Sequence, residues 1–155
     1  MSRQNVEIIR EFLEAFNRED YAACLSAIHP DVQWHPPPDI PNAAIANGRD
    51  ALIASWQDWL GAWDEYRHVP EEIVEGSANT VLVFAEESAR GKDSGIEVRS
   101  RRVSGVYELR DAKIVGFKAY LDRAEALQAA GLRESPARAR GPATEEDEGS
   151  EPGRQ

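Results

Sequence analysis

The spacing of apolar residues changes once along the chain, and this change limits the possible folds more than any other feature. Up to about residue 63, apolar side chains recur at helical spacing, as Val6, Ile9 and Phe12 do. From residue 69 to 121, strand-like segments follow one another through short turns, which is typical of an antiparallel meander. The sequence therefore predicts an α+β domain in which helices precede a sheet.

The expected elements are three helices, five strands and a closing helix. We expect helices at 6–16, 21–28 and 50–63, strands at 32–35, 69–75, 80–90, 96–109 and 113–121, and a last helix at 123–130. Asp20, Asp50 and Asp122 are the expected N-caps, and Gly131 is expected to end the last helix. The long strand should carry a bulge at Arg101-Arg102, where its alternation breaks. The proline-rich loop from 36 to 48 is expected to form a lid or a rim.

Length and composition indicate one domain with a tail. The chain has 155 residues, which suggests a single domain, and we assign it to residues 1–132. Residues 133–155 are rich in Pro, Gly, Glu, Arg and Ala and cannot bury enough apolar area to offset the entropy lost on ordering. We expect a disordered tail there; the alternative is a regulatory or partner-binding segment.

The charge of the chain excludes some classes of partner. The formal net charge is -10, which repels nucleic acid and anionic membrane surfaces. No secretory signal and no membrane-spanning apolar run is visible in the sequence. The single cysteine, Cys24, fits a reducing compartment. We therefore expect a cytoplasmic protein that binds neither nucleic acid nor membranes.

Four motifs occur in a fixed order: EFLEAFNRED, HPDVQWHPP, GRDAL and LRDAKIVGFKAYLDRAEALQAAGL. In this order and spacing, residues 5 to 132 resemble the SnoaL-like branch of the nuclear transport factor 2-like superfamily. The resemblance implies a cystatin-like α+β roll, in which three N-terminal helices wrap a cone-shaped, curved antiparallel sheet and a short C-terminal helix follows. It also implies a deep pocket and a homodimer formed through the sheet. Members include polyketide cyclases, ketosteroid isomerases and epoxide hydrolases, so the fold leaves the reaction open.

Residues carried over from these enzymes do not complete a known catalytic set. Ketosteroid isomerases have a tyrosine where this chain has Phe12, an aspartate base where it has His35, and a protonated aspartate where it has Ser104. Epoxide hydrolases of the fold have an arginine that matches Arg102, but Ser104 stands in place of their aspartate. The resemblance therefore argues against both of these mechanisms.

Three residues are the candidates for catalysis. His35 stands at a strand end beside the proline-rich loop and can exchange a proton near neutral pH; the alternative is a structural histidine. Arg102 with Ser104 could stabilise developing negative charge, with Glu87 as the partner of the arginine. Alternatively, a bulge turns Arg102 into solvent. His68 is interpreted as a surface or connector residue.

Aromatic residues are the candidates for binding a ligand. Trp34, Trp56, Trp59 and Phe12, together with Glu87, are expected to line a pocket for a small apolar molecule, although an aromatic stripe at helical spacing also suits a plain core. The sequence has no HExxH, CxxC, Walker or GxGxxG motif. We expect no metal and no cofactor.

Two functions remain open at this stage. One is a cofactor-free acid–base enzyme of the cyclase, isomerase or dehydratase type that acts on a small apolar substrate. The other is a non-catalytic module that binds a ligand or dimerises. The replacement of hydrogen-bonding groups by Phe12 and Ser104 favours the second function, because an absent donor removes transition-state stabilisation.

Overall fold

The computed structural model describes residues 2–39, 44–91 and 97–132. In these ranges the elements follow in the order α1 (Ser2–Asn17), α2 (Tyr21–Ser26), β1 (Ile28–His35), β2 (Ala46–Asn47), α3 (Arg49–Gly61), β3 (Trp63–Glu75), β4 (Thr80–Gly91), β5 (Glu97–Arg110), β6 (Lys113–Tyr120) and α4 (Arg123–Ala129). The predicted α+β class is confirmed. The turn expected after Arg90 lies largely outside the described residues, and the expected tail lies wholly outside them.

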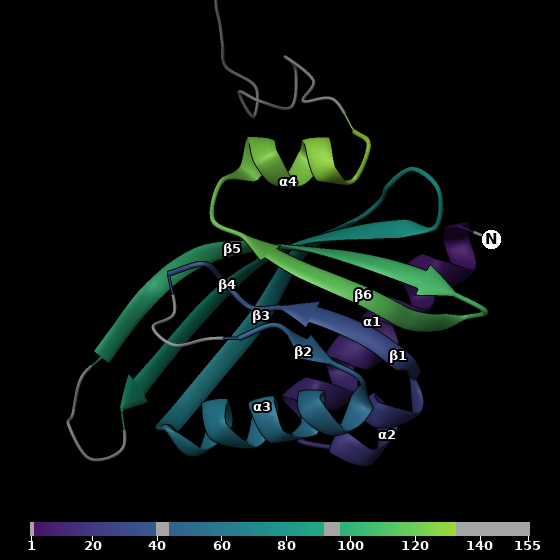
Figure 1. Cartoon of the computed structure of the whole chain (residues 1–155). Helices are drawn as coiled ribbons and strands as arrows, with labels where there is room; N and C mark the ends of the chain where they lie inside the picture. The colour runs from purple at the N-terminus through teal and green to yellow at the C-terminus, as the bar shows by residue number, and fades with distance from the viewer. Residues whose placement is uncertain (1, 40–43, 92–96, 133–155) are drawn as a thin grey trace, which may run out of the picture.

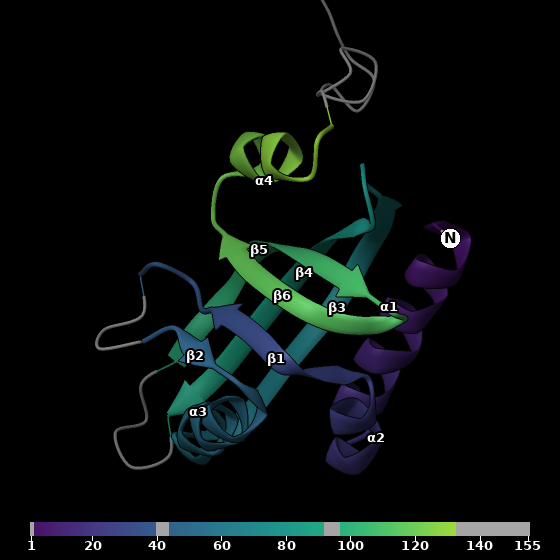
Figure 2. The same ribbon diagram turned by 45° about the vertical axis from the view of Figure 1, so that its right-hand side comes forward.

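All six strands form one sheet in the order β2-β1-β6-β5-β4-β3. The predicted meander of β3, β4, β5 and β6 is confirmed, with antiparallel pairing throughout. One pair differs from the expected antiparallel sheet, because β1 runs parallel to β6, with Gln33 opposite Gly116 and His35 opposite Lys118. These two strands lie far apart in sequence, so the chain between them is long enough for the crossover that parallel pairing needs. Figure 2 shows β1 beside β6.

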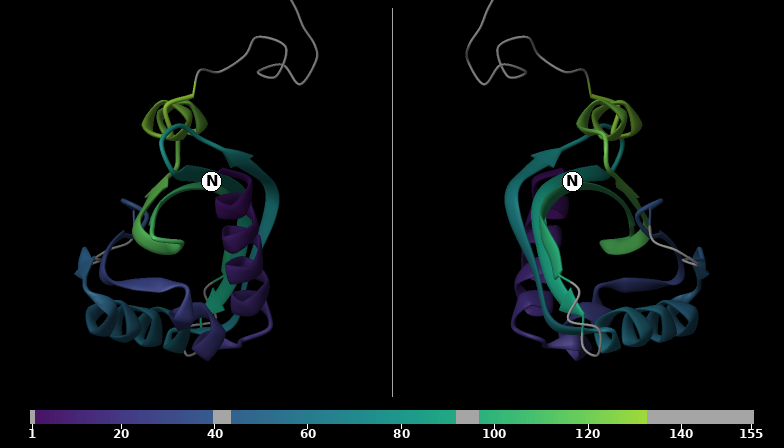
Figure 3. Two further views of the ribbon diagram at one scale, coloured as in Figure 1. Left: turned by 90° about the vertical axis from the view of Figure 1, so that its right-hand side faces the viewer. Right: turned by 90° about the vertical axis from the view of Figure 1, so that its left-hand side faces the viewer.

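The sheet curls strongly, and the helices divide between its two faces (Figure 3). Along β4, Val81, Val83 and Ala85 belong to the inner core together with residues of α1. The alternating Leu82 and Phe84 pack instead with α4 on the outer face. Because successive side chains of a strand point to opposite faces, β4 is buried on both sides, and this explains its continuous apolar sequence. Figure 1 shows α4 separated by the sheet from α3.

The predicted caps hold for two of the three helices. Asp20 accepts a hydrogen bond from the backbone N–H of Ala23, and Asp122 accepts one from that of Ala124. Gly131 has φ 75° and follows α4 as predicted; left-handed backbone of this kind favours glycine. For α3 the prediction was wrong, because Gly48 is the N-cap and Asp50 lies inside the first turn.

Two helix ends also differ from the prediction. The second helix ends at Ser26, and β1 already begins at Ile28. The third helix ends at Gly61, so Trp63 begins β3 and does not extend the helical stripe. The start of β3 at Trp63 was not recognised in the sequence. The polar pair Asp64-Glu65 that follows is compatible with the exposed face of a helix or of a strand. No described helix is both long and apolar enough to cross a membrane.

The β5–β6 hairpin carries backbone strain. Its two-residue turn has positive φ at both Asp111 (54°) and Ala112 (62°), as a type I′ turn requires. Alanine adopts this left-handed region at a cost, whereas glycine does not.

We expect Ala112→Gly to raise the free energy of unfolding by about 0.5–1 kcal/mol. Relief of strain of about 1–2 kcal/mol outweighs the added entropy of the unfolded chain, about 0.4–1 kcal/mol. Urea unfolding measures the change. Ala22→Gly, at an exposed position in α2, is the matched control and should destabilise by about 1 kcal/mol. An Ala112→Gly protein that is no more stable than wild type would contradict the strain assigned to this turn.

Candidate functional site

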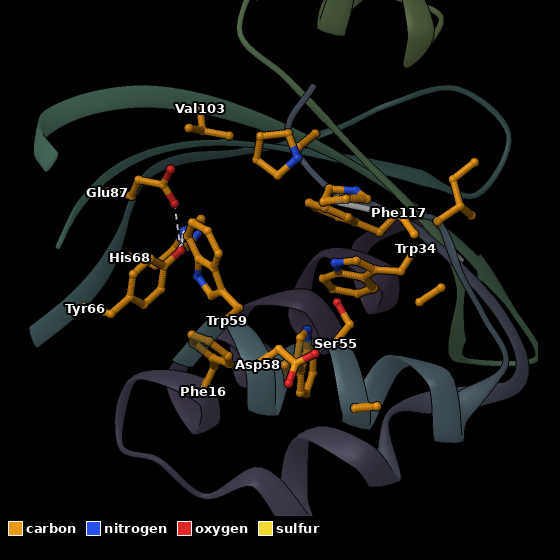
Figure 4. A pocket seen from close by; sticks show the side chains of 18 of the residues that line it. Phe16, Trp34, Ser55, Asp58, Trp59, Tyr66, His68, Glu87, Val103 and Phe117 are labelled. Atoms are coloured by element: carbon orange, nitrogen blue, oxygen red, sulfur yellow. Dashed lines mark hydrogen bonds between the residues drawn. The ribbon is translucent and has the colours of Figure 1, made fainter. Parts of the chain in front are cut away.

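A cavity of about 580 Å³ lies between α1, α3 and the inner face of the sheet, within the range of about 300–1,000 Å³ common for small-molecule sites. Eight aromatic residues contribute to its wall: Phe12, Phe16, Trp34, Trp56, Trp59, Tyr66, Tyr107 and Phe117. The residues expected to line a pocket, Phe12, Trp34, Trp56, Trp59 and Glu87, all contribute to this wall. Figure 4 shows several of them around the cavity.

The aromatic wall is held by contacts between its own rings. Trp34 stacks on Phe117 with 4.1 Å between ring centroids, and it meets Trp56 edge-on at 5.5 Å. Phe12 is buried and contacts both of these tryptophans. The residues that line the cavity therefore also belong to the core. The sequence left a pocket wall and a plain core as alternatives for these aromatic residues, and the two do not exclude each other. Aromatic rings that are held in position by neighbouring rings give a ligand a pre-formed apolar surface.

One end of the cavity is polar and is built by three neighbouring strands. Tyr66 and His68 come from β3, and Glu87 stands opposite His68 on β4. The Tyr66 hydroxyl donates to Glu87 Oε2 at 2.7 Å, the contact drawn in Figure 4. Arg101, from β5, donates through Nε to Glu87 Oε1 at 2.8 Å. Both oxygens of a carboxylate that is only 5% exposed are thus hydrogen-bonded, as a buried charge requires.

Arg101 also joins this polar end to the proline-rich loop. Its second guanidinium arm forms an ion pair with Asp39, which follows Pro36-Pro37-Pro38. Pro36 and Pro37 line the cavity, as do Ala44 and Ile45 from the far side of the same loop. The described parts of this loop thus lie at the rim of the cavity, which was one of the two roles expected for it.

The expected inward face of the long strand was wrong by one residue. The Arg102 side chain is 80% exposed and lies 3.5 Å from Glu71 on the outer face. Ser104 is buried, but it stands opposite Phe84 and Tyr120 on the side of α4. A bulge is present in β5, but it lies between Val98 and Arg101 and not at Arg101-Arg102 as expected, because Glu87 pairs with Arg101 while Ala89 pairs with Val98. From Arg101 to Glu108 the pairing with β4 is unbroken, so Arg101 shares the inner face of Val103 and Tyr107, whereas Arg102 lies on the outer face.

The expected role of His35 in the aromatic cavity was also wrong. Trp34 faces the cavity, so the next residue along β1 faces the other way. His35 instead borders a second cavity of about 450 Å³ beside Lys118 and Tyr120. Its Nε2 lies 3.1 Å from Gln33 Oε1. The structure therefore separates His35 from the tryptophans with which it was grouped.

His68 is the functional candidate that sequence reasoning missed. It was interpreted as a connector because the strand was expected to begin at residue 69, whereas β3 begins at Trp63. The alternation of Tyr66 and His68 with the exposed charged residues Glu65 and Arg67 was the available signal. An earlier strand start would have placed Tyr66 and His68 on one face.

The environment of the polar end changes the proton affinity of its residues. Burial lowers the pKa of His68 below its ordinary value of 6.5, and the Glu87 carboxylate partly offsets this effect. Burial raises the pKa of Tyr66, and the charge and hydrogen bond of Glu87 raise it further. His68 is therefore neutral near pH 7, and Tyr66 keeps its hydroxyl proton.

The hydrogen bonds indicate which nitrogen of His68 is free. Tyr66 has one hydroxyl proton and donates it to Glu87. The weaker contact of 3.5 Å between the same oxygen and His68 Nδ1 then requires the proton on Nδ1. Nε2 is left unprotonated and can accept a proton. Among the residues in the described ranges, no group of three or more His, Cys, Asp or Glu side chains is arranged to hold a metal ion.

We expect Arg101→Met to lower the free energy of unfolding by about 3 kcal/mol, because it leaves the buried Glu87 carboxylate without its cation. Arg102→Met is the matched control and should change stability by less than about 0.5 kcal/mol, since its side chain is exposed. Urea unfolding of both variants measures the difference. Equal effects of the two substitutions would contradict the inward placement of Arg101.

We expect the stability of the wild type to fall as the pH drops below about 6.5, because the unfolded chain then binds a proton at His68 more readily than the folded chain does. His68→Gln removes this contribution. Urea unfolding of both proteins at several pH values measures it, and the wild type should lose more stability on acidification than the variant. Identical pH dependence in the two proteins would show that His68 is not desolvated.

Comparison with solved structures places this architecture among known proteins. An NTF2-like protein of unknown function from Burkholderia pseudomallei has 27% sequence identity over 84% of this chain and 98% of its own, with a TM-score of 0.68. TerC, co-crystallized with polyporic acid, has 21% identity over 82% of this chain and 97% of its own, with a TM-score of 0.66. An LEH-like epoxide hydrolase of M. tuberculosis has 16% identity over 83% of this chain and 90% of its own, with a TM-score of 0.61.

Sequence comparison agrees with these similarities in fold. No curated protein matches the chain. The SnoaL-like domain family matches residues 9–117, a span that runs from α1 to β6 and includes Phe12, Trp34, Glu87 and Arg101. The chain belongs to the SnoaL-like domain family.

Proposed function

We propose that this protein binds a small, largely aromatic molecule in the cavity and transfers a proton to or from it through His68. The observation that carries this proposal is the position of His68 in an aromatic cavity, next to a Tyr66–Glu87 hydrogen bond. A pocket that is mostly apolar but has one convergent polar group is the common form of a small-molecule site.

The aromatic wall supports the size and type of the ligand. A volume of about 580 Å³ accommodates a molecule of a few fused or linked rings. Offset or edge-on contacts with Trp34, Trp56 and Trp59 would hold such rings. TerC, which shares the fold, was crystallized with polyporic acid. At 21% identity this similarity concerns the fold, and it supports the proposal only by showing an organic molecule combined with this architecture.

The polar end supports acid–base chemistry. Neutral His68 has Nε2 available as an acceptor, so it can remove a proton from a bound substrate. The imidazolium that forms would be stabilised by the Glu87 carboxylate on the neighbouring strand. Glu87 itself is a poor candidate for the base, because Tyr66 and Arg101 occupy its two oxygens. Its role in this proposal is to orient Tyr66 and to balance charge.

A non-catalytic ligand-binding module is the second candidate. The same saturated hydrogen bonding of Glu87 favours it, because a carboxylate that is satisfied by protein donors also serves to stabilise a cavity wall. Phe12, which cannot donate a hydrogen bond, lies at the centre of the aromatic contacts. In this case the cavity would bind a ligand and His68 would only shape its end.

A pair of histidine variants separates the two functions. We first screen the wild type by thermal shift against aromatic ketones, polyketide-like aromatics, steroids and epoxides, and then assay the stabilising class for turnover. We expect His68→Asn to reduce kcat by about 100-fold or more, the usual contribution of a general base. The dissociation constant of a stable ligand should change by less than about threefold, since the aromatic wall is intact.

His35→Asn is the matched control, because it replaces a histidine of the second cavity. It should leave turnover within about twofold of wild type, as expected for a residue outside the reacting cavity. Loss of turnover in His35→Asn with normal turnover in His68→Asn would overturn the proposal. Ligand binding without turnover in the wild type would establish the second candidate.

A further inference from the structure

The cavity wall has an unbalanced charge. Its charged side chains are Asp58 on α3 and Glu87 on β4, and no lysine or arginine belongs to the described lining residues. Glu87 is neutralised from behind by Arg101. Asp58 makes no hydrogen bond or ion pair with any residue that the structure describes, and its side chain is exposed. Among the lining residues that the structure describes, the uncompensated charge is therefore negative and belongs to Asp58.

Asp58 stands at a favourable place for a cation. Figure 4 shows its carboxylate on the α3 side of the cavity, across from Glu87. Next to it in sequence is Trp59, whose ring meets that of Tyr66 edge-on at 5.7 Å. Phe16 and Trp56 form a second such pair, also at 5.7 Å. Faces of aromatic rings attract cations, and these rings line the same cavity as the Asp58 carboxylate.

We propose that the natural ligand of this cavity is an aromatic amine, with its protonated nitrogen beside Asp58 and its rings against the tryptophans. This inference rests on the proposed function for the location of the ligand and adds its charge class. Because Asp58 is exposed, the ammonium group stays partly hydrated and avoids most of the desolvation cost of a buried ion. The aromatic part is removed from water, which supplies the apolar share of the affinity.

The same charges disfavour an acidic ligand. A carboxylate or phosphate in this cavity would meet Asp58 without a described cation on the wall to balance it. The whole chain, with a net charge of -10, adds a field that attracts cations and repels anions at low ionic strength. Among aromatic molecules of equal size, the binding order should therefore be amine, then alcohol, then acid.

Three probes with one ring system test this order. They are 2-(aminomethyl)naphthalene, 2-naphthalenemethanol and 2-naphthoic acid, and their dissociation constants are measured at pH 7 by tryptophan fluorescence and calorimetry. We expect the amine to bind about tenfold more tightly than the alcohol, the size expected of a carboxylate and cation–π contact at a partly hydrated site. The acid should bind more weakly than the alcohol.

Two variants of equal net charge show whether Asp58 is the cause. Asp58→Asn should bring the amine to within about twofold of the alcohol while leaving alcohol binding unchanged, as expected when one exposed charge is removed. Asp64→Asn is the control, because Asp64 is exposed and does not line the cavity; it should keep the tenfold preference. Melting temperatures check that both variants are folded.

The failures of the two proposals are distinguishable. An acid that binds as tightly as the amine, or an amine preference that survives Asp58→Asn, would overturn this inference and leave the proposed aromatic site in place. Absence of binding by all three naphthalenes would overturn both, since the aromatic cavity would not accept a ring system of matching size.

Discussion

Side chains alternate between two covered faces along β4, and this alternation decides which of them reach the cavity. Val81, Val83 and Ala85 face the inner core, whereas Leu82 and Phe84 face α4. A shift of one residue would exchange the two sets and bury the wrong surface on both sides, so the register is strongly fixed. Glu87 continues the inner series and reaches the end of the cavity. On β5, Arg101 stands opposite Glu87 and forms an ion pair with it, whereas Arg102 lies on the other face.

The Glu87 carboxylate makes the polar end a single unit. It accepts from Tyr66 on β3 and from Arg101 on β5, and Arg101 extends the link to Asp39 in the rim loop. A buried carboxylate needs such partners, because an unpaired charge at this depth would be strongly destabilising. The hydrogen bond that satisfies Glu87 also orders Tyr66, which lies beside His68 at this end of the cavity.

The cavity persists because its wall is made of large rings that support one another. Trp34, Phe12 and Trp56 contact each other at centroid distances of about 5.5–6.4 Å. The sheet curls away from α3 (Figure 3), and its strands β5 and β6 carry Tyr107 and Phe117 of the cavity wall. The same aromatic side chains pack in the hydrophobic core and line the cavity. Asp58 lines the cavity from α3, so the described wall combines aromatic rings, a polar end at Glu87 and one further carboxylate.

The sequence by itself determined the class of fold, the helix and strand content, the meander, most caps and the aromatic lining of the cavity. These features follow from local period and turn chemistry, which each segment carries within itself. Only the tertiary structure decided which arginine and which histidine face the cavity. Those choices depend on where β3 begins at Trp63 and on the register of β5 against β4, in which Arg101 stands opposite Glu87. Neither is visible in a local pattern, because a side chain's face in a sheet is set by its pairing with strands distant in sequence.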